Sequence, residues 1–298
     1  MQIGFVGLGK MGLNMVRRLL EDGEHDLVVF NRHKKPVAEA VKYGATRAGS
    51  LKGLVSRLKG PRTIWLMIPA GAPVDGAITK LTPLLKKGDC IIDGGNSNYK
   101  DSVRRAKALS AHGIDFLDAG TSGGVWGLTE GYCLMVGGKA AAFKRNESIF
   151  KSLAPEGGYG HMGRSGAGHY VKMVHNGIEY GLMQAYAEGF SLLEASEYKL
   201  DLEKISSLWN NGSVVRSWLL ELAERSLGED GSLAHIRPYV ADSGEGRWTV
   251  LDGMDKDISI PVITLSLLYR LRSREENPFA ARLLAALRDQ FGGHGVKK

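Results

Sequence analysis

Two kinds of hydrophobic pattern divide the chain. Through the first half, short apolar runs alternate with longer segments in which apolar residues recur every three or four positions, as in buried strands and amphipathic helices. The predicted strands cover residues 2–6, 27–30, 63–68, 90–93, 114–119, 132–136 and 158–161. Strands that alternate with helices are typical of a doubly wound parallel sheet, which predicts an α/β domain.

From Gly166 the apolar pattern is helical to the end of the chain. The predicted helices cover residues 168–195, 202–210, 214–227, 261–272 and 278–291, with a glycine-rich loop at 242–249. This change places a domain boundary near residue 163. We therefore predict an α/β domain over residues 1–163, followed by an all-α domain over residues 164–298.

The first helix of the second domain carries a polar face on an otherwise apolar segment. Four polar residues lie at positions i, i+3, i+4 and i+7, on one side of the helix: Lys172, His175, Asn176 and Glu179. Lys172 and Glu179 are about two turns, or roughly 10 Å, apart along the axis. A small molecule could lie between this potential base and this potential acid. A solvated helix face is the structural alternative, and the apolar border of the face favours a site.

The first predicted strand runs directly into a glycine-rich turn, Gly7-Leu8-Gly9-Lys10-Met11-Gly12. A GxGxxG sequence between a strand and a helix is a dinucleotide fingerprint, because glycines let the backbone approach the pyrophosphate and the helix N-terminus favours its charge. An isolated match is often chance, but here a second strand follows the helix. The sequence therefore predicts that the first domain is a Rossmann-type, dinucleotide-binding domain.

The residues after the second strand predict which dinucleotide binds. NAD sites place Asp or Glu there to bind the ribose hydroxyls, whereas this chain has Asn31-Arg32-His33. Arg32 can bind a 2′-phosphate through two hydrogen bonds and stack on adenine, so we predict NADP, with NAD possible. The predicted cofactor-binding residues are Gly7, Leu8, Gly9, Met11, Gly12, Asn31, Arg32, His33, Ile68, Pro69, Ala70 and Asn96.

Three more loops follow predicted strands, at Pro69, Asn96 and Ser122. In doubly wound sheets, ligands bind beyond the carboxyl ends of the strands. Each loop alone could be a plain turn. Three loops at one edge, facing the glycine-rich turn, indicate a binding site.

Composition excludes some classes of protein and leaves others open. No apolar run is long enough to cross a membrane and no leader pattern is present, so we expect a cytoplasmic protein. The net charge of +7 suits nucleic acid or anionic small molecules. Because the basic residues are scattered, phosphate-bearing ligands are favoured over nucleic acid. Cys90 and Cys133 are predicted core residues, and no His, Cys or Asp cluster predicts a metal.

Several of these segments resemble the β-hydroxyacid dehydrogenase superfamily: residues 5–12, Ser122-Gly123-Gly124 and the Gly-x-Gly-x-x-x-Lys sequence that ends at Lys172. Within that superfamily, residues 93–97, 172–180, 246–249 and 288–294 are similar to the decarboxylating 6-phosphogluconate dehydrogenases. The length resembles their short bacterial form, and the resemblance covers nearly the whole chain.

The resemblance implies oxidative decarboxylation of 6-phosphogluconate to ribulose 5-phosphate and CO2 with reduction of NADP, a step of the pentose phosphate pathway that serves gluconate utilization. It implies that Lys172 is the general base at the substrate's 3-hydroxyl and Glu179 the acid that protonates C1, with Asn176 as a third catalytic residue. The substrate-binding residues that it implies are Asn96, Ser122, Gly123, Gly124, His175, Tyr180, Arg270, Arg288 and His294. Arg288 and His294 are implied to reach a neighbouring subunit's site, in a homodimer or homotetramer.

The chain departs from the longer members of that family in two places. Ser243 and Glu245 stand where those members carry a phosphate-contacting Lys and a Thr, and Pro69 stands where they carry a Lys. Two other functions stay open: a dehydrogenase of an unphosphorylated 3-hydroxy acid such as 3-hydroxyisobutyrate, and a non-catalytic dinucleotide-binding protein. The decarboxylating enzyme is favoured over the first alternative by residues that supply an enediol acid and phosphate contacts, namely Glu179, Tyr180, Arg270, Arg288 and His294. It is favoured over the second because the base Lys172 and the acid Glu179 are both present.

Overall fold

The computed structural model describes residues 1–292. The chain forms two compact units, Met1–His175 and a second that begins at Asn176. Helix α8 (Ala167–Glu194) begins in the first unit and continues into the second. The last strand ends at Gly163, and the domain boundary at residue 163 stays a prediction. No helix within the described range is both long and apolar enough to cross a bilayer.

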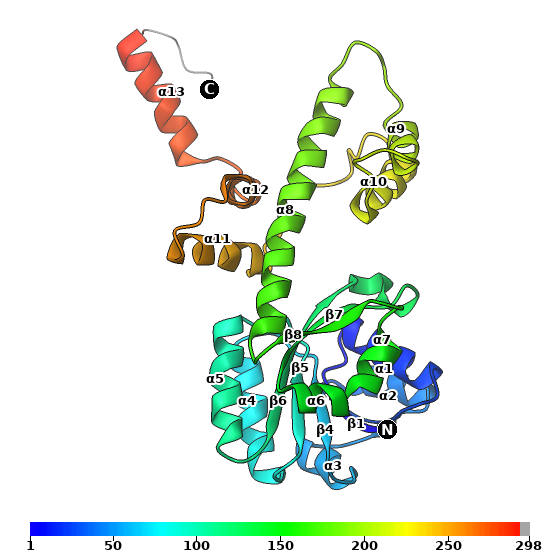
Figure 1. Cartoon of the computed structure of the whole chain (residues 1–298). Coiled ribbons are helices and arrows are strands. Elements are labelled where there is room, and N and C mark those ends of the chain that lie inside the picture. The colour runs from blue at the N-terminus through cyan, green and yellow to red at the C-terminus, as the bar shows by residue number, and fades with distance from the viewer. Residues whose placement is uncertain (293–298) are drawn as a thin grey trace. The chain divides into compact units, whose positions relative to one another are not determined.

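The first unit is built on a sheet that has eight strands in the described part of the chain (Figure 1). The strands are β1 (Gln2–Val6), β2 (Asp26–Phe30), β3 (Thr46–Arg47), β4 (Thr63–Leu66), β5 (Cys90–Asp93), β6 (Asp115–Ser122), β7 (Cys133–Gly138) and β8 (Tyr159–Gly163). Their order is β3-β2-β1-β4-β5-β6-β7-β8, and every pair is parallel except β6–β7. The order reverses between β1 and β4, which creates the switch point where such sheets bind ligands.

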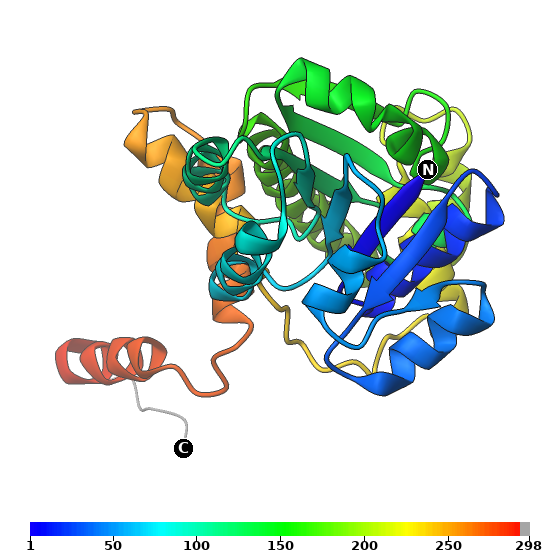
Figure 2. The same cartoon turned by 90° about the horizontal axis from the view of Figure 1, so that it is seen from below.

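Helices cover both faces of this sheet (Figures 1 and 2). One face packs against α1 (Lys10–Glu21), α2 (Lys34–Lys42), α6 (Ala140–Arg145) and α7 (Glu147–Leu153), and the other against α3 (Leu51–Ser56), α4 (Ala72–Leu81) and α5 (Tyr99–Ser110). Because side chains alternate along a strand, Phe5 enters one apolar core and Val6 the other. Burial on both faces explains why these strands read as continuous apolar runs.

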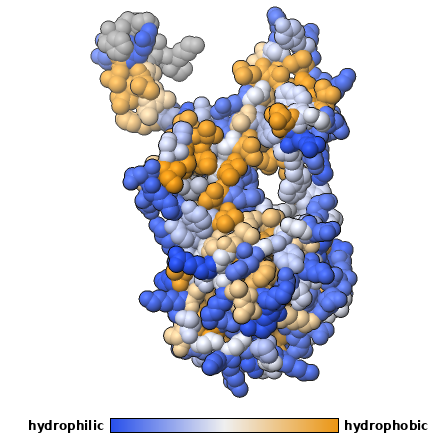
Figure 3. Space-filling model, in the orientation of Figure 1, coloured by the Kyte–Doolittle hydropathy of each residue, from blue (hydrophilic) through white to orange (hydrophobic). Residues whose placement is uncertain are grey.

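The second unit is helical. Its helices after α8 are α9 (Leu202–Asn210), α10 (Trp218–Glu229), α11 (Glu245–Asp255), α12 (Pro261–Arg272) and α13 (Phe279–Gly292). Its buried apolar cluster is small and centres on Tyr180, Val250 and Leu267. Many large apolar side chains are exposed instead, including Ile178, Leu182 and Val262, and Figure 3 shows apolar side chains gathered along these helices.

Several element boundaries differ from the predictions. The strand predicted to end at residue 119 continues to Ser122, because β7 pairs with it in antiparallel register up to Ser122 and Cys133. The helix predicted from residue 214 begins at Trp218, because the side chain of Ser217 accepts a hydrogen bond from the N–H of Leu220 and caps the helix. The predicted strand 63–68 ends at Leu66.

Two further predictions are wrong. The predicted loop 242–249 is helical from Glu245, and Gly244, which has a left-handed φ of 98°, is the N-cap residue that precedes α11. Cys133 is exposed rather than in the core, because it is the first residue of β7 and pairs with the last residue of β6. Cys90, in contrast, is buried as predicted.

Candidate active site

The glycine-rich turn has the geometry of a pyrophosphate site. Gly7 has a φ of 99°, and a Cβ there would overlap the carbonyl oxygen of Met67. A Cβ at Gly12 would overlap the carbonyl of Gly7, whereas Gly9 faces open space. Gly9 precedes α1 and provides no side-chain cap, so the first N–H groups of α1 can bind an anion. The turn is held in place because the N–H of Leu8 donates to Oδ1 of Asn31 at 3.1 Å.

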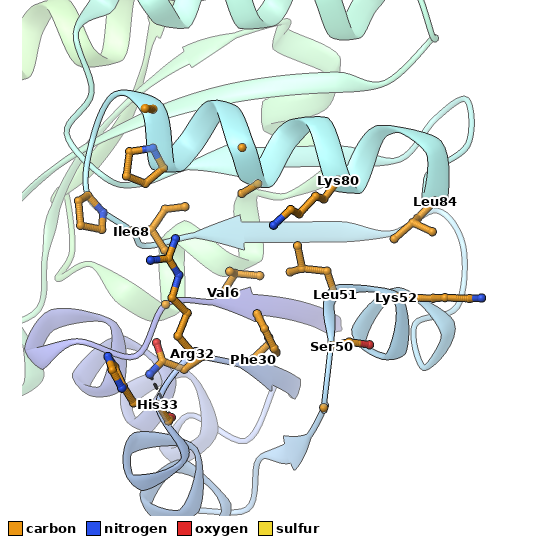
Figure 4. A pocket seen from close by; sticks show the side chains of 18 residues that line it. Val6, Phe30, Arg32, His33, Ser50, Leu51, Lys52, Ile68, Lys80 and Leu84 are labelled. Atoms are coloured by element: carbon orange, nitrogen blue, oxygen red, sulfur yellow. Dashed lines mark hydrogen bonds between the residues drawn. The ribbon is translucent and has the colours of Figure 1, made fainter.

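A cavity of about 680 Å³ lies at the carboxyl ends of β1, β2 and β4. Six predicted cofactor residues line it: Gly7, Asn31, Arg32, His33, Ile68 and Pro69. In Figure 4 the side chain of Arg32 extends toward Ile68. The cavity is also lined by residues that were not predicted from the sequence, namely residues 49–52 and the face of α4 that includes Pro73, Ala77 and Lys80. Small residues on one face of α4 were the signal that could have indicated it.

Asn96 links two loops at the same edge of the sheet. Its Nδ2 donates to the carbonyl of Thr121 at 3.0 Å, and the N–H of Thr121 donates to its Oδ1 at 2.8 Å. Asn96 itself has a left-handed φ of 51°. Asp93 supports this conformation by accepting hydrogen bonds from the N–H of Gly95 and the hydroxyl of Ser97. The Asn96 loop and the end of β6 are therefore held together.

Arg105, which the sequence analysis missed, connects the β4 and β5 loops. Its guanidinium donates to Asp93 at 3.2 Å, to Asp75 at 2.8 Å and to the carbonyl of Gly71 at 3.0 Å. The hydrogen bond from Arg105 is the largest cause of the lowered pKa of Asp75. Arg105 lies in the middle of α5 and reads as an ordinary surface charge in the sequence, so no local pattern distinguishes it.

The first turns of α8 place Lys172 against the sheet. A Cβ at Gly120 on β6 would overlap Cβ of Lys172 and lie 2.8 Å from the carbonyl oxygen of Gly168. Only a glycine at this position allows the helix to approach so closely. Lys172 is 4% exposed. Its Nζ lies 3.3 Å from Nδ1 of His175, whose Nε2 lies 3.4 Å from Oγ of Ser122.

The buried carboxylate of Asp118 binds backbone N–H groups at the N-terminus of α8. Asp118 accepts hydrogen bonds from the N–H groups of Gly166 at 2.7 Å and His169 at 2.9 Å. Burial raises the pKa of Asp118 even though these two hydrogen bonds and the nearby His169 oppose the shift. The imidazole of His169 also pairs with the hydroxyl of Ser102 at 2.7 Å. The register of α8, and therefore the position of Lys172, is set by these contacts.

In the second unit, the ring of Tyr180 on α8 stacks against the guanidinium of Arg270. The guanidinium of Arg270 lies 3.4 Å from the ring centroid of Tyr180, a geometry that stabilises the cation. The hydroxyl of Tyr180 donates to Asp242 at 3.2 Å. Burial alone would raise the pKa of Asp242, but hydrogen bonds from the Gly244 N–H, Arg247 and Tyr180 lower it overall.

The predicted substrate-binding residues that contact one another form two groups. Ser122, Lys172 and His175 lie together in the first unit, and Tyr180 and Arg270 lie together in the second. Gly123 and Gly124, with positive φ angles, follow Ser122 directly. Asn176 and the half-buried Glu179 lie on α8. Arg288 lies on α13, and His294 lies outside the described residues.

The loop that departs from the longer family members contacts α8 in the second unit. Glu245 is buried and its carboxylate accepts a hydrogen bond from Nδ2 of Asn176 at 2.6 Å. Ser243 donates to the same carboxylate oxygen at 3.4 Å. Among residues 1–292, no three His, Cys, Asp or Glu side chains gather closely enough to hold a metal ion.

The cavity at the switch point of the sheet and the buried Lys172 of α8 are the features of a nicotinamide dinucleotide-dependent dehydrogenase. Residues 2–163 match the NAD binding domain of 6-phosphogluconate dehydrogenase, and residues 168–278 match the 6-phosphogluconate dehydrogenase C-terminal domain. The chain belongs to the 6-phosphogluconate dehydrogenase family.

Individual relatives differ in length and in cofactor. The NAD(+)-dependent, decarboxylating 6-phosphogluconate dehydrogenase of Haloferax volcanii is 48% identical, over 100% of this chain and 99% of that protein. The structure of Plasmodium falciparum 6-phosphogluconate dehydrogenase, studied with its cofactor NADP+ and with 6-phosphogluconate, is similar with a TM-score of 0.85 and 30% identity, over 98% of this chain and 65% of that one. A 3-hydroxyisobutyrate dehydrogenase of Salmonella typhimurium, with a TM-score of 0.72 and 22% identity over 89% of this chain and 91% of that one, shares the fold.

Proposed function

We propose that this protein oxidises and decarboxylates 6-phosphogluconate with a nicotinamide dinucleotide, to give ribulose 5-phosphate and CO2. The observation that carries the proposal is the position of Lys172, which is buried on α8 against β6 and lies beside His175. The names of the Haloferax volcanii and Plasmodium falciparum relatives support this substrate.

The roles of the catalytic side chains follow from their order along α8. Lys172 takes the proton of the substrate's 3-hydroxyl, and a nicotinamide dinucleotide held by the glycine-rich turn and the cavity would supply the hydride acceptor for C3. The protonated Lys172 then donates a hydrogen bond to the new carbonyl oxygen, which favours loss of CO2 from the β-keto acid. Glu179, two turns further along the same helix, delivers a proton to C1 of the resulting enediol. The stack of Tyr180 and Arg270 supplies a cation for the substrate phosphate.

The residues of the first unit fit a dinucleotide, and we assign NADP as the preferred one. Arg32 and Lys80 line the cavity, and no Asp or Glu is among its lining residues in the described part of the chain. An acid there would repel a 2′-phosphate, whereas an arginine can bind it. The Arg32→Asp variant should therefore lose preference for NADP and gain preference for NAD. The matched control is Lys34→Asp, which makes the same change of charge on α2 outside the cavity lining.

Initial rates test the activity directly. The enzyme is supplied with 6-phosphogluconate and either NADP or NAD, and the reduced cofactor and the released CO2 are measured. Equal amounts of the two products are expected, with a higher kcat/KM for NADP. No turnover with 6-phosphogluconate, together with turnover of 3-hydroxyisobutyrate, would refute the proposal in favour of an unphosphorylated 3-hydroxy acid.

We also assign the protein to a homodimer or homotetramer in which Arg288 and His294 complete a neighbouring site. Large apolar side chains on α8, α11 and α12 support this, because Ile178, Met254 and Val262 are each more than half exposed in one chain, and such patches usually mark interfaces. Light scattering should give at least twice the mass of one chain. A truncation after Gln290 should assemble and yet lose activity, whereas full activity would refute the shared site.

A further inference from the structure

The first turn of α11 is packed closely against α8. A Cβ at Gly246 would overlap the ring of Tyr180, and a Cβ at Gly177 would lie 2.6 Å from Cγ2 of Thr249. The two glycines therefore let the helix backbones approach each other. Because Glu245 is the first residue of α11, this packing holds its backbone at a defined distance from α8.

The side chain of Glu245 meets the amide of Asn176. Nδ2 of Asn176 lies 2.6 Å from Oε2 of Glu245, and the two residues are 8% and 7% exposed. A hydrogen bond to an ionised group that is shielded from water is stronger than a neutral one at the surface. A carboxylate has no proton to donate, so it can bind only the NH2 side of the amide.

We propose that Glu245 is a positioning residue that fixes the orientation of the Asn176 amide, so that its Oδ1 and not its NH2 group is presented to the substrate. With Nδ2 held by Glu245, Oδ1 is turned away from the carboxylate and acts as a hydrogen-bond acceptor. Because Oδ1 can only accept, a substrate hydroxyl opposite it has to donate its proton, which fixes the direction of that O–H bond. A rotated amide would present an NH2 group, to which the hydroxyl would have to accept instead. The inference rests on the proposed function, because it takes Asn176 to be a substrate contact.

Glu245→Gln separates this role from simple packing. The substitution keeps the shape of the side chain, but an amide can both donate and accept, so it no longer selects one orientation of Asn176. Because the Asn176 amide is then no longer held in the orientation that binds the substrate, kcat/KM for 6-phosphogluconate should fall at least about tenfold. The KM for NADP and the Tm should stay close to those of the unmodified enzyme.

Two further variants make the test specific. Ser243→Ala removes the longer, 3.4 Å hydrogen bond to Glu245 without changing Asn176, and should retain most of kcat/KM. Asn176→Asp should be the worst variant, because it brings two carboxylates together. Combining it with Glu245→Gln restores one donor and one acceptor, so the double variant should be more active than Asn176→Asp alone.

The outcomes distinguish this inference from the proposed function. If the unmodified enzyme releases CO2 from 6-phosphogluconate and Glu245→Gln has the same kcat/KM, Glu245 does not position Asn176. A loss of activity that only follows a loss of Tm, with no rescue in the double variant, would also overturn the inference. Absence of turnover by the unmodified enzyme would instead overturn the proposed function and this inference with it.

Discussion

Replacing Arg105 with methionine should destabilise the first unit strongly, because it leaves a buried carboxylate without its cation. The side chains of Arg105 and Asp93 are 1% and 0% exposed. Methionine preserves most of the apolar length of the arginine side chain but none of its five donors. The contacts to Asp93, Asp75 and the carbonyl of Gly71 are lost together.

The structure sets the size of the effect. Breaking a buried ion pair by removing one partner costs about 3–5 kcal/mol. Asp93 keeps its hydrogen bonds from Gly95 and Ser97, so we expect the lower end, about 3 kcal/mol. For a unit of this size, 1 kcal/mol changes Tm by about 2–4 °C, which gives a decrease of roughly 6–12 °C.

Arg104→Met is the matched control in the neighbouring position. Arg104 pairs with Asp75 and Asp101, but its side chain is 57% exposed, and exposed pairs contribute about 0–1 kcal/mol. Calorimetry and urea unfolding of both variants give the comparison. The KM for the dinucleotide should also rise in Arg105→Met, because the Gly71 loop lies next to cavity residues Pro69 and Ala72.

The pH dependence provides a second criterion. Arg105 lowers the pKa of Asp75, and a lowered pKa stabilises the folded state above the pKa of the unfolded state. That contribution is lost as the pH falls through the folded-state pKa. The difference in free energy of unfolding between Arg105→Met and the unmodified enzyme should therefore become smaller below about pH 4. Equal decreases of Tm in Arg104→Met and Arg105→Met would refute the reasoning.

Three other changes test α8 and its supports. Lys172→Met should lower kcat by at least about 100-fold while the Kd of NADP, measured by calorimetry, is unchanged; normal turnover would exclude Lys172 as the base. Gly120→Ala should lower the free energy of unfolding by about 1–3 kcal/mol and reduce activity, because the new methyl group overlaps Lys172. Gly189→Ala, at a position on α8 where a Cβ faces open space, is the control and should lower neither quantity. In Asp118→Asn the side chain has one acceptor oxygen for the N–H groups of Gly166 and His169. The free energy of unfolding at neutral pH should therefore fall by about 1–3 kcal/mol. Because burial raises the pKa of Asp118, the stability of the unmodified protein falls as the pH rises between its unfolded and folded pKa values, and urea unfolding of Asp118→Asn should lack this dependence.

The sequence alone predicted the parts of the site that depend on local spacing. Gly7, Gly9 and Gly12 were interpretable because a strand and a helix flank them, and the structure has the predicted strand and helix at these positions. Lys172 and His175 were predicted to share a helix face because three residues separate neighbours on a helix, and their side chains lie 3.3 Å apart.

Contacts between distant segments could not be predicted in this way. Arg105 and Asp75 are 30 residues apart, and Asn176 and Glu245 are 69 apart. Periodicity reports which face of an element is apolar, but it does not report which polar side chain of another element will lie opposite. The same limit explains why the sequence could not predict the hydrogen bond between Glu245 and Asn176.

The sequence by itself therefore determined the α/β sheet, the glycine-rich turn and the order of polar residues along α8, because each depends on local conformation and on burial of a periodic apolar face. Only the tertiary structure decided the antiparallel pairing of β6 and β7, the burial of Lys172 against Gly120, and the partners of Arg105 and Glu245. These features depend on backbone approach and on the pairing of buried charges across the fold. Such pairing follows from the packing of whole elements, not from the pattern within any one of them.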